Sequence, residues 1–317
     1  LPLEDWKASN PLAAVKCALG TWFARAAHEV PDLRAAVAEH RPDVMLVDVN
    51  TWGALSAAEA SGVPFAVYSP YFLDFDIPGR PPFGLGLAPR GDTLGRVRDR
   101  VLRTLMKGTV GPWLRKLDAL RGPLGLPPVE SLGALALRAD VVLYLTAEPL
   151  EYAHGGWPEK VRLVGPGLWE PSSEAAPAPA EGARPLALVT CSTEFQDDGR
   201  LIEVALEALA DEDLEVVATT AAVDPSRFRA PPNARVVRYA PHGPLLRRAE
   251  VVICHGGMGI TQKALAAGVP VCVVPFGRDQ LDVARHVEVA GAGARVAPAR
   301  LTAPRLREAV ALARSRR

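Results

Sequence analysis

Two polar clusters stand where apolar runs end within residues 251–280. The first apolar run ends in His255, Gly256 and Gly257, and a helix-like segment over 258–268 follows. The first N–H groups of a helix lack partners within it and carry the positive end of its dipole. Glycines let a ligand approach this backbone, so the pattern favours a diphosphate-like anion with His255 as an added donor. A tight turn with a hydrogen-bonded histidine explains the same residues without a ligand.

The second cluster, Asp279 and Gln280, follows the next apolar run, VPVCVVP at 269–275. Ligands of open α/β sheets bind outside the carboxyl ends of the strands, so both side chains should flank the same ligand as His255. A carboxylate beside a carboxamide suits the vicinal hydroxyls of a sugar. Asp279 should also cap the helix that follows, a structural role that is compatible with binding.

A second His-Gly-Gly triplet occupies His154, Gly155 and Gly156, but Trp157 and Pro158 follow it instead of a helix-like segment. We expect a loop there. The sequence context, and not the triplet itself, distinguishes the two copies.

Short β-branched runs alternate with helical segments along the chain, which predicts an α/β fold with parallel sheets. Most of the expected strands are continuously apolar, as in strands covered by helices on both faces. These strands are 43–48, 63–69, 140–146, 186–192, 214–220, 234–239, 251–255 and 269–275.

Residues 92–121 carry apolar side chains at helical spacing, with arginines between them. This pattern predicts a pair of helices that packs one face and exposes the other. The alternative is a basic amphipathic surface that binds a membrane or an anionic partner.

Residues 170–185, EPSSEAAPAPAEGARP, interrupt this alternation with proline, alanine and small polar residues. Such a composition is typical of an extended linker between domains. We therefore expect an N-terminal domain over 1–170, a linker over 171–184 and a C-terminal domain over 185–317.

Composition disfavours several classes of partner. Basic and acidic residues number 36 each, so net charge favours neither nucleic acid nor an anionic membrane. No apolar run approaches the roughly 18 residues that span a bilayer, and the first residues lack a signal-peptide pattern. We expect a cytoplasmic protein without stable membrane insertion. The four cysteines are scattered and should be reduced.

Residues 255–293, HGGMGITQKALAAGVPVCVVPFGRDQLDVARHVEVAGAG, resemble the donor-binding signature of the UDP-glycosyltransferase superfamily, particularly bacterial members that glycosylate antibiotics. Residues 236–242 are similar to the family's base-contacting strand end, and residues 188–193 to the first strand of its donor domain. Residues 161–171 resemble the segment before its linker. The resemblance implies a GT-B fold, in which two Rossmann-like domains face each other across a cleft.

The resemblance also assigns residues. The diphosphate would contact His255, Gly256, Gly257, Met258, Gly259, Ser192 and Thr193; the sugar, Asp279 and Gln280; and the nucleobase, Tyr239, Ala240 and His242. His242 stands where many relatives have glutamine. Tyr68, Tyr71, Phe72 and Phe75 are candidates for an acceptor pocket, although core packing explains them equally well.

The chemistry implied by the family is inverting transfer of a hexose or deoxyhexose from a dTDP- or UDP-sugar to a hydroxyl of a small natural-product-like acceptor. Fixed donors must stabilise the charge that develops on the leaving diphosphate. We expect no metal and no cofactor besides the nucleotide-sugar co-substrate, since no DxD-type acidic pair stands beside a strand end. The sequence is also compatible with a homodimer.

The family's general base is a histidine after the first strand, which an aspartate orients. Asp48 matches the aspartate, whereas His28 and His40 lie in a helix-like segment and do not match the histidine. Compared with the family, this sequence lacks segments that match the first strands of the N-terminal domain and the final helices. We expect that this sequence omits segments of a longer protein; a natural or engineered fragment is the alternative.

Other functions stay open. The missing histidine suits a non-catalytic protein that uses the donor fold to bind or activate a partner enzyme. Another GT-B enzyme, such as a lipid-linked sugar transferase or a sugar-nucleotide epimerase, is disfavoured by Asp279 and Gln280. An NAD-dependent dehydrogenase is disfavoured because no GxGxxG follows a strand.

Overall fold

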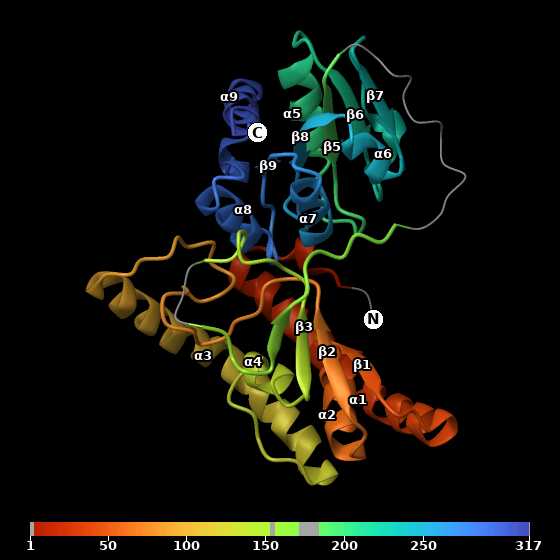
Figure 1. Cartoon of the computed structure of the whole chain (residues 1–317), viewed down its shortest axis with the longest axis vertical. Helices are drawn as coiled ribbons and strands as arrows, with labels where there is room; N and C mark the ends of the chain where they lie inside the picture. Colours follow the sequence, from red (N-terminus) through yellow and green to blue (C-terminus); the bar gives the residue numbers. More distant parts are fainter. Residues whose placement is uncertain (1–2, 153–155, 171–183, 317) are drawn as a thin grey trace. The chain divides into compact units, whose positions relative to one another are not determined.

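The computed structural model describes residues 3–152, 156–170 and 184–316, which divide into two compact units (Figure 1). Residues 84–88, 149–151 and 166–170 are grouped with the second unit, so its make-up differs in detail from the predicted domains. The domain boundaries stay a prediction, because the expected linker lies almost entirely outside the described residues. His154 and Gly155 of the first His-Gly-Gly triplet lie outside them too.

The first unit contains a four-stranded parallel sheet in the order β1-β2-β3-β4. Its strands are β1 (Met45–Asp48), β2 (Phe65–Ser69), β3 (Val141–Tyr144) and β4 (Val161–Leu163). Its helices are α1 (Pro11–His40), α2 (Trp52–Ser61), α3 (Thr93–Arg121) and α4 (Leu132–Ala136). The Trp22 ring of α1 meets the Trp52 ring of α2 edge-on, with centroids 5.8 Å apart, so aromatic packing joins the two helices.

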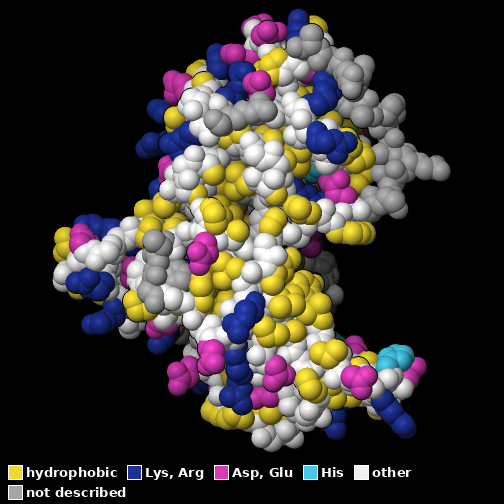
Figure 2. All heavy atoms as spheres, in the orientation of Figure 1, with side chains coloured by type: hydrophobic (Ala, Val, Ile, Leu, Met, Phe, Trp, Pro, Cys, Tyr) yellow, Lys and Arg dark blue, Asp and Glu magenta, His cyan; other side chains and the backbone are white. Residues whose placement is uncertain are grey.

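Residues 92–121 differ from the expected helix pair. They form the single helix α3, which begins at the cap Asp92 and continues through Pro112. The expectation of a packed apolar face is wrong for its first half, where four apolar side chains are more than half exposed: Leu94, Val97, Val101 and Leu105. Hydrophobic and basic side chains lie next to one another on the surface at this end of α3 (Figure 2). Neither α3 nor any other helix in the described chain is long and apolar enough to cross a membrane.

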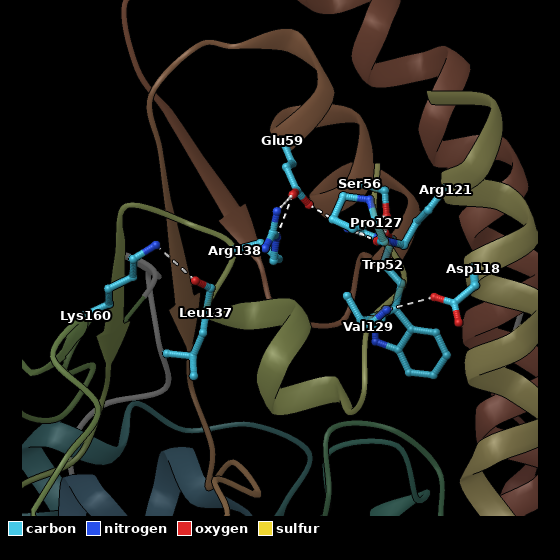
Figure 3. Close-up of polar contacts among 10 residues, drawn as sticks. All are labelled: Trp52, Ser56, Glu59, Asp118, Arg121, Pro127, Val129, Leu137, Arg138 and Lys160. Carbon is cyan, nitrogen blue, oxygen red and sulfur yellow. Dashed lines mark hydrogen bonds and ion pairs between the residues drawn. The ribbon is translucent and has the colours of Figure 1, made fainter. Parts of the chain in front are cut away.

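A buried arginine joins α2 to the end of α3 (Figure 3). Arg121 is fully buried, and its guanidinium donates to Glu59 Oε2 at 2.9 Å and to Ser56 Oγ at 3.3 Å. It also donates to Pro127 O, and Glu59 pairs in addition with Arg138. The paired charges satisfy a buried guanidinium and fix the position of the segment that follows α3.

Asp118 allows a test of this region's stability. Its Oδ1 accepts the backbone N–H of Val129 at 2.9 Å, and Val129 is buried (Figure 3). We expect Asp118→Ala to lower the free energy of unfolding by about 1 to 3 kcal/mol, because the buried N–H loses its acceptor. Urea unfolding measures this loss as a lower midpoint, with an unchanged slope of unfolding free energy against urea concentration. The matched control is Asp213→Ala, which removes an exposed ion pair with Arg184 and should leave the midpoint where it was.

The second unit contains a six-stranded parallel sheet in the order β10-β9-β8-β5-β6-β7. Its strands are β5 (Leu186–Thr190), β6 (Glu215–Thr219), β7 (Ala234–Val237), β8 (Ala249–Cys254), β9 (Val271–Val273) and β10 (Gly293–Arg295). Its helices are α5 (Arg200–Leu209), α6 (His242–Leu246), α7 (Met258–Ala266), α8 (Gln280–Val289) and α9 (Ala303–Arg314). From β5 the chain builds outward through β6 and β7, and then returns to β8 on the other side of β5. The strand order therefore reverses between β5 and β8, where open α/β sheets bind ligands.

The predicted α/β class with parallel sheets is confirmed. Strands occupy all eight predicted segments, although β8 begins two residues earlier than expected and the other seven are trimmed at one or both ends. The sequence did not reveal β4 and β10, because each has only three residues and includes an arginine, VRL and GAR.

Candidate functional site

The His-Gly-Gly turn follows β8 at the point where the strand order reverses. Gly256 has φ of +95°, and a Cβ there would lie 2.8 Å from Val273 Cγ1. At Gly257 a Cβ would lie 2.4 Å from Nε2 of His255. The turn therefore needs both glycines, and it packs the imidazole against the backbone that enters α7.

Helix α7 begins directly after this turn with Gly257 as its N-cap, and glycine has no side chain to cap the helix. The N–H groups of the first turn, including those of Met258 and Gly259, lack partners within the helix. Met258 is buried, whereas Gly259 is exposed. These N–H groups could donate hydrogen bonds to an anion from solvent, and the predicted diphosphate contact stays a prediction.

His255 supplies a side chain at the same place. It is 7% exposed, and its Nδ1 is buried without a hydrogen-bond partner among the described residues. Burial lowers the pKa of His255; the negative charge of Asp198 and a hydrogen bond with the backbone of Thr190 oppose this shift, and the charge of Arg278 adds to it. A neutral imidazole has one N–H, so His255 is suited to donate a single hydrogen bond near neutral pH.

The loop after β5 places Ser192 beside the same strand ends, since Thr190 of β5 is in register with Cys254 of β8. The Ser192 N–H donates to Asp198 Oδ2 at 2.7 Å, and its Oγ accepts from Gln196 Nε2 at 2.6 Å. The hydroxyl hydrogen of Ser192 remains as its donor to a ligand. Thr193 is exposed.

Gln280 is turned into the protein. Its side chain is buried, and its Oε1 accepts the N–H groups of Phe276 at 2.7 Å and Gly277 at 3.1 Å. Its Nε2 donates to Gln196 Oε1 at 2.7 Å. Gln280 therefore fixes the loop after β9 and joins it to the Ser192 loop. Its predicted contact with a sugar stays a prediction.

Asp279 is the N-cap residue of α8, as predicted, but its carboxylate makes no cap hydrogen bond within the described chain. Its backbone is helical, which turns the side chain away from the N–H groups that a cap would reach. Burial raises the pKa of Asp279 to about 6, although a hydrogen bond from its own N–H and the charge of Arg278 oppose the shift. A desolvated carboxylate with a raised pKa is a candidate for binding.

The segment predicted to meet a nucleobase follows β7. Tyr239 is 47% exposed and Ala240 is buried. His242 begins α6, and its Nε2 lies 3.2 Å from Oγ1 of Thr219, at the end of β6. Burial lowers the pKa of His242, and the charge of Glu170 opposes this.

Glu170 fixes the same segment, which the sequence did not predict. Its carboxylate accepts the N–H groups of His242 at 3.2 Å and Gly243 at 3.1 Å, and it pairs with Lys263. Burial disfavours ionisation of Glu170, but the hydrogen bond from Gly243 and the contact with Lys263 outweigh it and lower its pKa. The sequence signal nearest to Glu170 was its place in residues 161–171, the segment that resembles the one before the family's linker.

The remaining candidates belong to the first unit. Asp48 ends β1, where its Oδ1 accepts the N–H of Asn50 at 2.7 Å, and a hydrogen bond to Asp48 raises the pKa of Tyr68. The Tyr71 hydroxyl also hydrogen-bonds to Asn50.

Two aromatic candidates for the acceptor pocket are buried in the core, and the two histidines that did not match the general base are exposed. Phe72 is 1% exposed and Phe75 is 3% exposed, so the structure supports core packing for both and not an acceptor pocket. His28 and His40 are exposed on α1, as their place in a helix-like segment indicated.

Solved structures share this fold. The crystal structure of the kitacinnamycin glycotransferase is 26% identical, with a TM-score of 0.72, over 99% of this chain and 76% of that one. The glycosyltransferase VinC in complex with dTDP is 21% identical, with a TM-score of 0.62, over 99% of this chain and 77% of that one. The parallel sheets and these neighbours define the fold class as GT-B, the architecture that the sequence resemblance implied.

Sequence comparison gives the family. Residues 203–315 match the C-terminal domain of erythromycin biosynthesis protein CIII-like proteins. The 4'-demethylrebeccamycin synthase of Lentzea aerocolonigenes is 35% identical over 297 residues, which cover 90% of this chain and 69% of that protein. The chain therefore belongs to the bacterial natural-product glycosyltransferases, as the sequence resemblance predicted.

Proposed function

We propose that this glycosyltransferase moves a hexose or deoxyhexose from a dTDP- or UDP-sugar to a hydroxyl of a small natural-product-like acceptor. One observation carries the proposal: the His255 turn and the uncapped start of α7 lie at the strand-order reversal, where a diphosphate would meet several donors. The dTDP bound to VinC, a structural neighbour, supports the choice of nucleotide.

In this proposal the diphosphate contacts His255, the Ser192 hydroxyl, Thr193 and the N–H groups of residues 257–259. Asp279 accepts hydrogen bonds from sugar hydroxyls, and Gln280 holds the loop beside it. The nucleobase lies against residues 239–242, which Glu170 keeps in place.

The acceptor oxygen attacks the anomeric carbon as the bond from that carbon to the diphosphate breaks. The bonding electrons leave with the diphosphate, and the N–H donors stabilise the negative charge that develops there. We propose that these donors suffice without a metal, so the rate should be unchanged by EDTA. Asp48 would orient the base that takes the acceptor proton, and we assign no residue of this sequence to that base.

Two measurements test the proposal. Calorimetry with dTDP and UDP reports binding, and chromatography after incubation with a nucleotide sugar and a panel of phenolic and macrolide acceptors reports glycoside and released nucleoside diphosphate. We expect binding of at least one nucleotide and equal amounts of both products. Absence of nucleotide binding together with absence of release would overturn the proposal.

The second candidate function is a non-catalytic partner of another enzyme. It is favoured by one observation: among the described residues, the recorded hydrogen-bond partners of the Asp48 carboxylate are Asn50 and Tyr68, and neither is a histidine. Nucleotide binding without turnover for any donor and acceptor would support this reading over transfer.

A further inference from the structure

A short segment at 84–88 belongs to the second unit, although residues before and after it belong to the first. Helix α8 holds this segment, and α8 follows the loop that carries Asp279. The contacts of this segment show how it is fixed.

Asp282 binds the segment through both carboxylate oxygens. Its Oδ2 accepts the N–H of Gly84 at 2.6 Å, and its Oδ1 accepts the N–H of Gly86 at 3.3 Å. From the next turn of α8, Arg285 Nε donates to Gly86 O at 2.9 Å. Asp282 is 3% exposed, so these bonds are charge-assisted and shielded from water.

The segment can approach α8 only because of its glycines. Gly84 and Gly86 have φ of +93° and +57°, a region that favours glycine. A Cβ on Gly86 would lie 2.7 Å from the carbonyl oxygen of Leu281. The backbone of the segment is therefore packed directly on the first turn of α8.

A second segment is attached to the same helix. The buried side chains of His286 and Glu151 face each other, with Nε2 and Oε2 3.7 Å apart. His286 Nδ1 donates to the carbonyl oxygen of Asp282 at 2.8 Å. Helix α8 thus holds residues 149–151 as well as residues 84–88.

Asp282, which anchors the segment, follows the proposed sugar contact Asp279 by one helical turn. Asp279 and Asp282 are three residues apart, and the Asp282 N–H donates to Asp279 O at 3.0 Å. Side chains at this spacing are neighbours on a helix surface. The Asp282 carboxylate hydrogen-bonds to the segment, whereas the Asp279 carboxylate has a pKa that burial raises.

We propose that residues 84–88 form a wall of the sugar subsite and that Asp282 is the positioning residue that holds this wall against α8. The proposal rests on the proposed function, because it assigns the sugar to Asp279. Leu85, whose side chain is 39% exposed between the two anchored glycines, is the side chain that the wall presents at a fixed position. The diphosphate site at the start of α7 does not involve the wall.

The test compares binding of a nucleoside diphosphate with and without its sugar. We expect Asp282→Ala to weaken the affinity for dTDP-glucose about 10-fold, the size of one buried charge-assisted hydrogen bond, and to leave the affinity for dTDP unchanged. Gly86→Ala should show the same selective loss through its clash with Leu281. Calorimetry gives both affinities, and UDP-glucose with UDP replaces this pair if the protein prefers uridine.

The control is Asp213→Asn, which changes an exposed acid of the same unit that pairs with Arg184 and contacts neither α8 nor residues 84–88 in the recorded ion pairs. It should alter neither affinity. Equal losses for dTDP and dTDP-glucose in Asp282→Ala would show a general distortion of the unit and overturn the proposal, and so would unchanged affinity for both. Failure of the wild-type protein to bind dTDP or UDP would instead count against the proposed function.

Discussion

Replacement of His255 by alanine should slow sugar transfer about 10²- to 10³-fold, which corresponds to about 3 to 4 kcal/mol of transition-state stabilisation. The imidazole packs against Gly257 at the start of α7, and burial keeps it a neutral donor. The donor acts where charge develops as the diphosphate leaves, so the loss should appear mainly in kcat. Steady-state kinetics with a saturating nucleotide sugar measures it.

Two further variants separate this effect from a loss of structure. His255→Gln keeps an N–H donor of similar reach and should recover part of the rate. His28→Ala removes an exposed histidine of α1 and should leave kcat unchanged. A His255→Ala protein that keeps the wild-type kcat would show that the histidine only fills the turn, as the sequence alone also allowed.

Much of the donor half of the site could be predicted from the sequence, because its strands are buried and continuously apolar. Polar residues that end such strands meet at one edge of a parallel sheet, whatever the details of the loops. This rule placed His255 after β8 and Asp279 after β9, as the structure has them, whereas the family resemblance supplied Ser192 after β5.

The direction of a side chain within a loop could not be predicted in this way. Gln280 follows the same rule as Asp279, yet it turns inward to the N–H groups of Phe276 and Gly277. Asp282 and Glu170 bind backbone groups of segments that lie far away along the chain. Such bonds depend on tertiary structure, and neither periodicity nor a short motif encodes them.

In the first unit, the composition of the sequence obscured which side chains are buried. Aromatic residues near a strand end suit a pocket and a core equally, and burial assigns Phe72 to the core. Conversely, α3 has the periodicity of a packed helix but exposes Leu94 and Leu105. Periodicity identifies an apolar face of a helix without showing what covers it.

Asp279→Asn should stabilise the protein near neutral pH while it weakens binding of the nucleotide sugar. Burial raises the pKa of Asp279 from 3.8 to about 6 in the folded state. The folded state therefore binds more protons than the unfolded state between these values. The stability that this provides is complete below pH 3.8 and is lost as pH rises through about 6. An asparagine does not ionise, so at pH 7.5 the variant should be more stable by about 1 to 3 kcal/mol.

Sugar binding should change in the opposite direction. A carboxylate accepts hydrogen bonds from sugar hydroxyls more strongly than an amide does, so Asp279→Asn should weaken the affinity for the nucleotide sugar about 10- to 100-fold. In the wild-type protein this affinity should fall as pH drops through about 6, because the carboxylate is protonated, and the variant should lack this dependence.

Urea unfolding at pH 4.5 and 7.5, with calorimetry at the same pH values, checks both effects, and Asp213→Asn on an exposed site is the matched control. A variant that loses stability at pH 7.5 would show that Asp279 has a structural partner. A gain in stability with unchanged sugar affinity would remove Asp279 from the sugar site. The expected combination is that of a binding group: desolvation of the carboxylate destabilises the folded protein, and a ligand that donates hydrogen bonds to it is favoured.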